Sequence, residues 1–462
     1  MASSVRRAVG FAVVGTFVLA VPFIAASNVS FSASWFNSIV PAIDPAGMTA
    51  IVISLPFLFG TVVSLVTSNG PLFDLFAFPA DYEEGRLFGL ANFCLAAGGL
   101  AAFSLQIELS LTIFVASVLL VVYGNLGEKL ARRRTDDPLV AVVAFLCVSW
   151  CSAIVGQWVT LSMLDNPLIP AKLLFLAITG GLFAALLRSV LPDRDDPIII
   201  LSVTFALWIL NGIVPAISTS YVLIALAVTI AFGYLSYALE TASITGMLSG
   251  VVIAFVTIVL GGFEWFAVLI AFFGGGGLVT KFRYETKRDR GLAQDNEGAR
   301  GGGNVIANSL VALLAVLGNA TAEFIGLSPS VFVLAFAGAV ATAMSDTLSS
   351  EIGGLYGPPR LITTLKPVAP GTDGGVTLQG FFAGIAGAGV IALLSIGLFD
   401  SVTIAGSLIV VAAGTIGMLV DSLLGATIEG AALGNMGVNF LATLSGGLSA
   451  LGLTLLGGVV VL

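Results

Sequence analysis

Residues 329–345 read PSVFVLAFAGAVATAMS, an uncharged run of seventeen residues that ends directly before Asp346. A helix of this length and composition reaches across the hydrocarbon core of a bilayer. Similar runs recur along the chain, so the sequence predicts about fifteen membrane-spanning helices. The runs are continuous rather than alternating, which excludes a β-barrel. The predicted fold class is therefore an all-α, polytopic integral membrane protein.

The composition agrees with this class and excludes several kinds of chemistry. Of the 462 residues 58% are hydrophobic and 10% charged, whereas a soluble protein needs far more polar surface. The chain contains no histidine, which excludes a Ser-His-Asp triad and histidine general bases. No basic face with interleaved aromatic residues is present, so nucleic acid is not an expected partner.

The positive charges predict how the chain crosses the membrane. With Arg6 and Arg7 in the cytosol, the predicted spans place seventeen of the eighteen lysines and arginines on the cytosolic side and only Lys172 outside. Cytosolic loops carry such an excess, which also explains the basic run Lys287–Arg290. We therefore predict a multi-pass cell-membrane protein with a cytosolic N-terminus. The run at 8–27 is expected to be a retained helix rather than a cleaved signal peptide.

The chain divides near residue 230 into two parts of different character. Residues 1–230 hold about eight spans with short connections, and their sequence does not indicate a role. Residues 231–462 hold about seven spans and many small residues, which let membrane helices approach closely. This second part also carries three polar segments, at 281–303, 346–377 and 420–444, all predicted on the cytosolic face.

Glycines in the first polar segment precede a predicted helix. Gly298, Arg300 and Gly302 lead into it, and Asn304 and Asn308 share one of its faces because they are four residues apart. Backbone N–H groups and the helix dipole attract anions at such an N-terminus. We expect these five residues to bind the phosphates of a nucleotide or cosubstrate.

The second polar segment follows the apolar run directly and reads SDTLSSEIGGLYGPPRLITTLKPVAPGTDGG over residues 345–375. Asp346, Glu351 and Asp373 offer the hard oxygen ligands that Mg²⁺ prefers, so we predict them as metal ligands. If the helix continues, Asp346 and Glu351 point about 140° apart, and a shared metal then needs the following loop.

The same segment offers groups that suit phosphate. Lys366 can neutralise phosphate charge, as lysines do in phosphoryl-transfer sites. Gly371 and Gly374 flank Asp373 in a turn sequence and make backbone amides available. We predict Asp346, Lys366 and Asp373 as catalytic residues, and the two glycines as part of the nucleotide site.

The third polar segment, DSLLGATIEGAALGNMGVN, covers residues 421–439. Asp421 and Glu429 lie near one face if the segment is helical, and ionisable groups at membrane depth usually face partners or a cavity. Whether these two carboxylates take part in the predicted site is left open by the sequence.

Together the polar segments resemble the family of membrane proteins related to transmembrane protein 19, also called domain of unknown function 92. The resemblance covers roughly residues 225–462 and is carried by four motifs. They are GARGGGNVIAN (298–308), SDTLSSEIG (345–353), PGTDGG (370–375) and DSLLGAT (421–427). A looser similarity to phosphatidate cytidylyltransferases is weakened by the lysine segment, which reads LKPV at 365–368.

The resemblance implies a function. Plant and cyanobacterial members of this family are phytyl-phosphate kinases, which convert a prenyl monophosphate to the diphosphate, and their relatives include CTP-using lipid kinases. By resemblance, Asp346, Glu351 and Asp373 are ligands of a metal or nucleotide, and Arg300 and Lys366 contact phosphate.

Residues and resemblance favour the same hypothesis. We expect a membrane-embedded kinase that uses Mg²⁺ and CTP, or ATP, to phosphorylate an isoprenyl monophosphate. A cytidylyltransferase that makes a CDP-lipid is one alternative, and a secondary transporter with a midplane site is another. The prenyl chain, the preferred nucleotide and the oligomeric state are not indicated.

Overall fold

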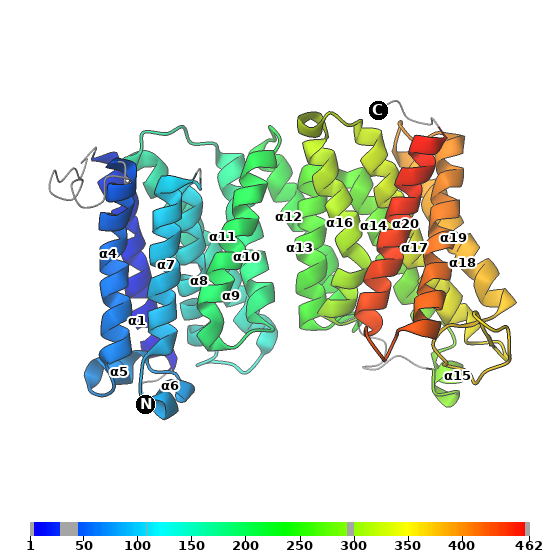
Figure 1. Ribbon diagram of the computed structural model, residues 1–462, viewed down its shortest axis with the longest axis horizontal. Helices are drawn as coiled ribbons and strands as arrows, with labels where there is room; N and C mark the ends of the chain where they lie inside the picture. The colour runs from blue at the N-terminus through cyan, green and yellow to red at the C-terminus, as the bar shows by residue number, and fades with distance from the viewer. Residues whose placement is uncertain (1–3, 28–44, 108, 293–299, 458–462) are drawn as a thin grey trace. The chain divides into compact units, whose positions relative to one another are not determined.

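A computed structural model describes residues 4–27, 45–107, 109–292 and 300–457 (Figure 1). Within this part of the chain, fifteen helices are long and apolar enough to cross a membrane. The predicted all-α, polytopic class and the number of spans are therefore confirmed. Many of their large apolar side chains are exposed, as expected of helices that face lipid.

The chain forms two compact units, residues 1–222 and 223–462, with the division inside one helix, α12. The helices of the N-terminal unit are α1 (Ser4–Thr16), η1 (Phe17–Leu19), α2 (Ala20–Ala26), α4 (Pro45–Val66), α5 (Pro71–Phe76), α6 (Pro79–Glu84), α7 (Phe88–Gln106), α8 (Leu111–Ala131), α9 (Pro138–Met163), α10 (Pro170–Arg188), η2 (Asp193–Asp195) and α11 (Asp196–Ile213).

The C-terminal unit contains most of α12 and all later elements. These are α12 (Thr219–Ala238), α13 (Ile244–Gly261), α14 (Phe263–Lys281), α15 (Tyr284–Asp289), α16 (Gly302–Ile325), α17 (Pro329–Gly353), β1 (Arg360–Leu361), β2 (Gly375–Val376), α18 (Leu378–Leu398), α19 (Ile404–Thr427) and α20 (Asn435–Leu456). The strands β1 and β2 pair antiparallel in the loop between α17 and α18.

Helix α17 is the centre of the C-terminal unit and packs against α14, α16, α18, α19 and α20. Small residues make this possible. A Cβ atom on Gly338 of α17 would lie 2.7 Å from the Cβ of Ala450, and one on Gly414 of α19 would lie 2.9 Å from the Cβ of Ala341. Close packing through glycine and alanine is typical of membrane helices. It fixes the helix that carries Asp346.

The polar segments are shorter than the sequence predicts. Helix α17 runs on to Gly353, so the second loop covers only residues 354–377, and prolines just beyond the helix end prevent its continuation. Helices α19 and α20 leave only residues 428–434 between them. Asp421 is therefore helical, and Glu429 lies beyond the end of its helix.

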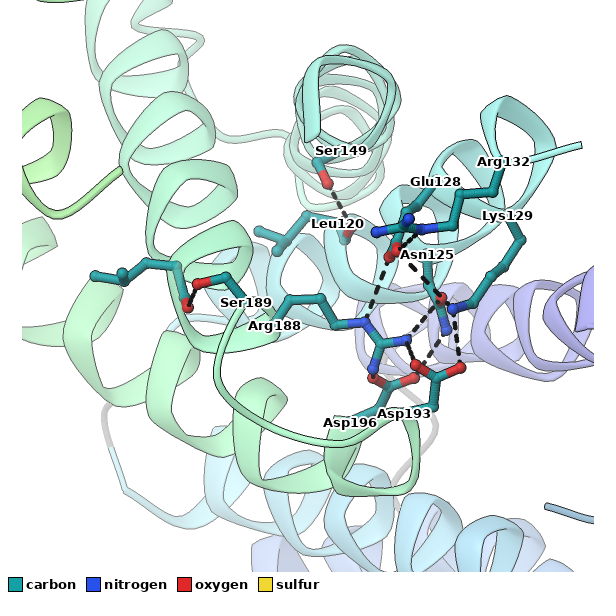
Figure 2. Close-up of polar contacts among 11 residues, drawn as sticks. Leu120, Asn125, Glu128, Lys129, Arg132, Ser149, Arg188, Ser189, Asp193 and Asp196 are labelled. Carbon is teal, nitrogen blue, oxygen red and sulfur yellow. Dashed lines mark hydrogen bonds and ion pairs between the residues drawn. The ribbon is translucent and has the colours of Figure 1, made fainter. Parts of the chain in front are cut away.

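A buried ion cluster joins α8, α10 and the start of α11 in the N-terminal unit (Figure 2). The Arg188 guanidinium donates to Asp196 Oδ1 (3.0 Å) and to Asp193. It also donates to Asn125 Oδ1 (3.2 Å) and lies 3.5 Å from Glu128 Oε2. The Arg188 side chain is only 7% exposed, and a charge at that depth is tolerated only with such partners. Arg188 thus ties three helices together through its buried contacts.

Candidate functional site

The polar residues of the C-terminal unit meet in a cavity of about 360 Å³ at one end of its helices. This is the end at which α15 lies in Figure 1. The walls come from α15–α17, the 354–377 loop, and the junction of α19 and α20. The lining includes the acidic residues Asp346, Glu351, Asp373, Asp421 and Glu429, the cations Lys287 and Arg300, and the amides Asn304, Asn308, Asn435 and Asn439.

Two carboxyl groups face each other in this cavity. Asp346 comes from α17 and Asp421 from α19, and their side chains lie within hydrogen-bonding reach of each other. Asp421 Oδ1 is buried and has no hydrogen-bond partner among the described residues. Neighbouring carboxyl groups cannot both remain ionised without a cation or a shared proton. An oxygen-only donor pair with one unsatisfied buried oxygen fits Mg²⁺.

A tight backbone approach brings Asp373 to the same place. Gly374 has a φ of +72°, and its carbonyl accepts from the N–H of Ile362 (3.0 Å) in the β1–β2 hairpin. A Cβ atom on Gly374 would lie 2.4 Å from the Cβ of Ala426 on α19. Only glycine meets both conditions. The hairpin can therefore rest on α19, with Asp373 beside the Asp421 end of the cavity.

Glu429 adds a further carboxyl group just after α19. Burial raises the pKa of Glu429, the charge of Asp373 raises it further, and a hydrogen bond with Asn435 acts in the opposite direction. Asp373 and Glu429 thus concentrate negative charge on one wall.

Glu351, predicted as a metal ligand, forms an ion pair with a lysine. Lys287 Nζ donates to Glu351 Oε2 (2.6 Å) and to the carbonyl of Thr280 (2.6 Å), and the lysine side chain is only 3% exposed. Because α17 is helical through both residues, Glu351 and Asp346 point in different directions. The Glu351 carboxylate therefore holds α15 against α17 through Lys287.

The charges of the cavity do not balance. The described lining has five carboxyl groups and two cations, and the Lys287–Glu351 ion pair removes one of each. Four carboxyl groups then stand against Arg300 alone. A cavity of this charge attracts a cation, and it accepts phosphate only together with a metal ion.

Arg300 is fixed through its backbone. Its N–H donates to the carbonyl of Thr241 (2.9 Å), and its carbonyl accepts from the N–H of Ser243 (3.1 Å) in the connection between α12 and α13. A Cβ atom on Gly246 would lie 2.1 Å from the Arg300 carbonyl oxygen, so the start of α13 also packs directly on this residue. The position of the Arg300 main chain beside the cavity is therefore fixed.

The Arg300 guanidinium lies beside two aromatic rings. Its guanidinium carbon lies 5.1 Å from the ring centroid of Phe272 and 5.9 Å from that of Phe273. Burial lowers the pKa of Arg300, and the charge of Glu351 partly offsets this. No hydrogen bond or ion pair joins the guanidinium to the described residues. Its N–H donors remain available to a ligand.

The other predicted phosphate-binding residues divide into three groups. Asn304 and Asn308 line the cavity from α16, and Gly371 and Gly374 line it from the loop. Gly302 is not part of the lining. Its N–H donates to Thr245 Oγ1 (3.4 Å), and the residue packs against α13 at the start of α16. Gly298 lies outside the described residues.

Lys366 does not take part in the cavity. It lies on an exposed turn, where its carbonyl accepts from the N–H of Leu361 (3.0 Å), and its side chain is not among the lining residues. Among the described lining residues, the cation without an ion-pair partner is Arg300.

No ready-made cluster of three or more acidic, cysteine or histidine ligands occurs among residues 4–27, 45–107, 109–292 and 300–457. Mg²⁺ does not need one, because it is usually held by one or two carboxylates together with substrate phosphates. The facing pair Asp346 and Asp421 meets that requirement, with Asp373 nearby.

Residues 227–447 match the model of the integral membrane protein family DUF92. The uncharacterized membrane protein MJ0933 of Methanocaldococcus jannaschii is 36% identical over 44% of this chain and 82% of its own length. Protein PGR of Arabidopsis thaliana is 32% identical over 44% of this chain and 78% of its own length. Chloroplastic protein VTE6 of the same plant is 34% identical over 40% of this chain and 57% of its own length. The chain belongs to the DUF92 family through its C-terminal half, as its motifs predicted. No solved structure matches it.

Two features of the cavity were not assigned from the sequence. Asp421 was left undecided, although an aspartate within an apolar, glycine-rich run was the available signal. Lys287 was attributed to the positive-inside rule, because a buried lysine cannot be told from its exposed neighbours by sequence alone.

Proposed function

We propose that the C-terminal unit is a membrane-embedded phosphotransferase that converts an isoprenyl monophosphate to the diphosphate, with CTP or ATP as donor. The observation that carries this proposal is the acidic cavity in which Asp346 and Asp421 face each other beside Arg300. The sequence resemblance to phytyl-phosphate kinases supports an isoprenyl acceptor within this family of membrane proteins.

In the proposed reaction an oxygen of the acceptor phosphate forms a bond to the γ-phosphorus of the nucleotide. The bond from that phosphorus to the β–γ bridging oxygen breaks, which gives prenyl diphosphate and a nucleoside diphosphate. The acceptor phosphate is already ionised, so no general base is needed, and the absence of histidine is no obstacle.

The residues of the chain supply positioning and charge. Asp346 and Asp421 would hold Mg²⁺, with Asp373 beside them, and the bound ion would neutralise charge on the nucleotide phosphates. Arg300 would bind phosphate oxygens with N–H donors that no described residue uses. Asn304 and Asn308 would donate to the same ligand from α16.

We place the cavity on the cytosolic side, where nucleotide is available. The positive-inside pattern of the loops supports this orientation. A transporter is less well supported, because the acidic groups gather at one end of the helices and not midway along them.

The test uses purified full-length protein in detergent with Mg²⁺, geranylgeranyl monophosphate, and CTP or ATP labelled in the γ-phosphate. We expect label in geranylgeranyl diphosphate. Nucleotide transferred from α-labelled CTP to lipid would instead identify a cytidylyltransferase. If no label moves from either nucleotide, the phosphotransferase proposal is wrong.

A further inference from the structure

A second cavity, of about 460 Å³, lies in the C-terminal unit among α12, α13 and α14. Its lining is mainly apolar and includes Met247, Val251 and Leu269. Leu239 and Leu278 belong to it as well and are 55% and 76% exposed. This volume is typical of small-molecule sites, and such a lining binds hydrocarbon.

Arg300 belongs to the lining of both cavities. Its guanidinium carbon lies 5.1 Å and 5.9 Å from the ring centroids of Phe272 and Phe273, and the guanidinium has no ion-pair partner among the described residues. This arrangement suits an amphiphile. The apolar cavity can hold its hydrocarbon chain, and the cation between the two cavities can bind its anionic head group.

We propose that the apolar cavity binds the hydrocarbon chain of the acceptor, and that Arg300 holds the acceptor phosphate where the two cavities meet. This inference rests on the proposed function, because it assigns the tail of the same substrate. The occupant is a single prenyl chain. The acceptor thereby presents its phosphate to Asp346 and Asp421.

Glycines in the wall allow a direct steric test. Gly250 of α13 and Gly277 of α14 both line the apolar cavity, and a Cβ atom on either would meet no protein atom within 4 Å. Because both positions are open and line the cavity, we expect leucine at either one to take up cavity space. Gly389 of α18 also has open space but lines neither cavity, which makes it the matched control.

The first measurement compares acceptors of different chain length in the phosphoryl-transfer assay. We expect Gly250→Leu and Gly277→Leu to raise KM for geranylgeranyl monophosphate at least about 10-fold relative to KM for dimethylallyl monophosphate. Gly389→Leu should keep the wild-type ratio. An unchanged ratio in both cavity variants would overturn the tail site while leaving the kinase proposal intact.

The second measurement does not depend on turnover. A diazirine analogue of geranylgeranyl monophosphate is photolysed with full-length protein in lipid nanodiscs without nucleotide, and the labelled peptides are mapped by mass spectrometry. Label on α12–α14 that both cavity variants reduce about 10-fold, and Gly389→Leu does not, supports the tail site even if no phosphoryl transfer is found.

Two results of the labelling would overturn the tail site. One is label on helices outside the cavity that the leucines do not change. The other is displacement of the label by diacyl phosphatidic acid but not by unlabelled geranylgeranyl monophosphate, which would identify the cavity as a site for ordinary phospholipid.

Discussion

Asp421 Oδ1 is buried next to the carboxyl group of Asp346 and has no hydrogen-bond partner in the part of the chain that the structure describes. The pair costs stability when no cation is bound, and a bound cation reverses this effect. A ligand that binds only the folded state stabilises it by about 2.7 kcal/mol at 100 times its Kd. We therefore expect Mg²⁺ to raise the Tm of the protein through these two residues, whether or not the protein is catalytically active.

Asp421→Asn should raise the Tm of the metal-free protein, because it removes the repulsion within the pair. It should also abolish most of the Tm increase that Mg²⁺ gives the wild type, and lower phosphoryl transfer by about 100-fold or more. Differential scanning fluorimetry with and without Mg²⁺ measures the first two effects. Asp400→Asn is the control, since Asp400 is exposed and lies outside the cavity. An undiminished Mg²⁺ response in Asp421→Asn would refute the metal assignment.

At the scale of single residues, the sequence predicted the kinds of groups in the cavity better than their partners. Asp346, Asp373, Arg300 and the two asparagines line it, and their roles in binding metal or phosphate stay predictions. Lys366 does not, because the direction of an exposed turn depends on long-range backbone contacts. Glu351 lines the cavity but is bound by Lys287, a contact between residues 64 positions apart that no local pattern reveals.

At the scale of elements, the hairpin loop is held to α19 by one glycine. Gly374→Ala places a side chain in the left-handed region and 2.4 Å from the Cβ of Ala426. We expect a loss of about 2 kcal/mol of local stability and detachment of the 354–377 loop. Limited proteolysis should cleave the variant within this loop faster than the wild type. Gly357→Ala is the control, since a Cβ there lies no closer than 3.9 Å to its nearest neighbour, and equal cleavage of all three proteins would contradict the prediction.

The ion cluster of the N-terminal unit predicts a second effect at this scale. Arg188→Met leaves three buried or half-buried carboxyl groups without their common partner, which should cost about 3–5 kcal/mol. Thermal unfolding in detergent measures this loss. Arg134→Met is the comparison, because Arg134 is exposed and forms no ion pair with the described residues, and its effect should stay within about 0.5 kcal/mol. Equal losses in the two variants would show that the cluster does not stabilise the unit.

Helix number and approximate position were predictable because hydrocarbon length selects runs of nearly constant length. Helix ends were not, since polar residues such as Asp346 do not stop a helix whose backbone bonds are satisfied. The boundary of the second loop was therefore placed early, at 346 instead of 354.

At the scale of the whole molecule, the family match begins at residue 227, and 44% of this chain covers 82% of its archaeal relative. We expect residues 215–462 to fold alone, since this cut keeps α12 intact together with Ser218, whose hydroxyl accepts from the N–H of Tyr221. The fragment should retain the Mg²⁺-dependent Tm increase and the transfer activity within about 10-fold. A monodisperse fragment without either property would show that residues 1–214 contribute to the site.

If the apolar cavity among α12, α13 and α14 binds the acceptor chain as proposed, with exposed Leu239 and Leu278 in its lining, it determines which concentration of the acceptor governs binding. An acceptor that reaches Arg300 between helices is drawn from a two-dimensional reservoir. Its availability is then a mole fraction in the surrounding lipid, and acceptor-free lipid added to the same mixed micelles dilutes it although the amount per litre is unchanged. Saturation curves for the acceptor should therefore coincide only on a surface-concentration axis, whereas those for the nucleotide should follow its bulk concentration.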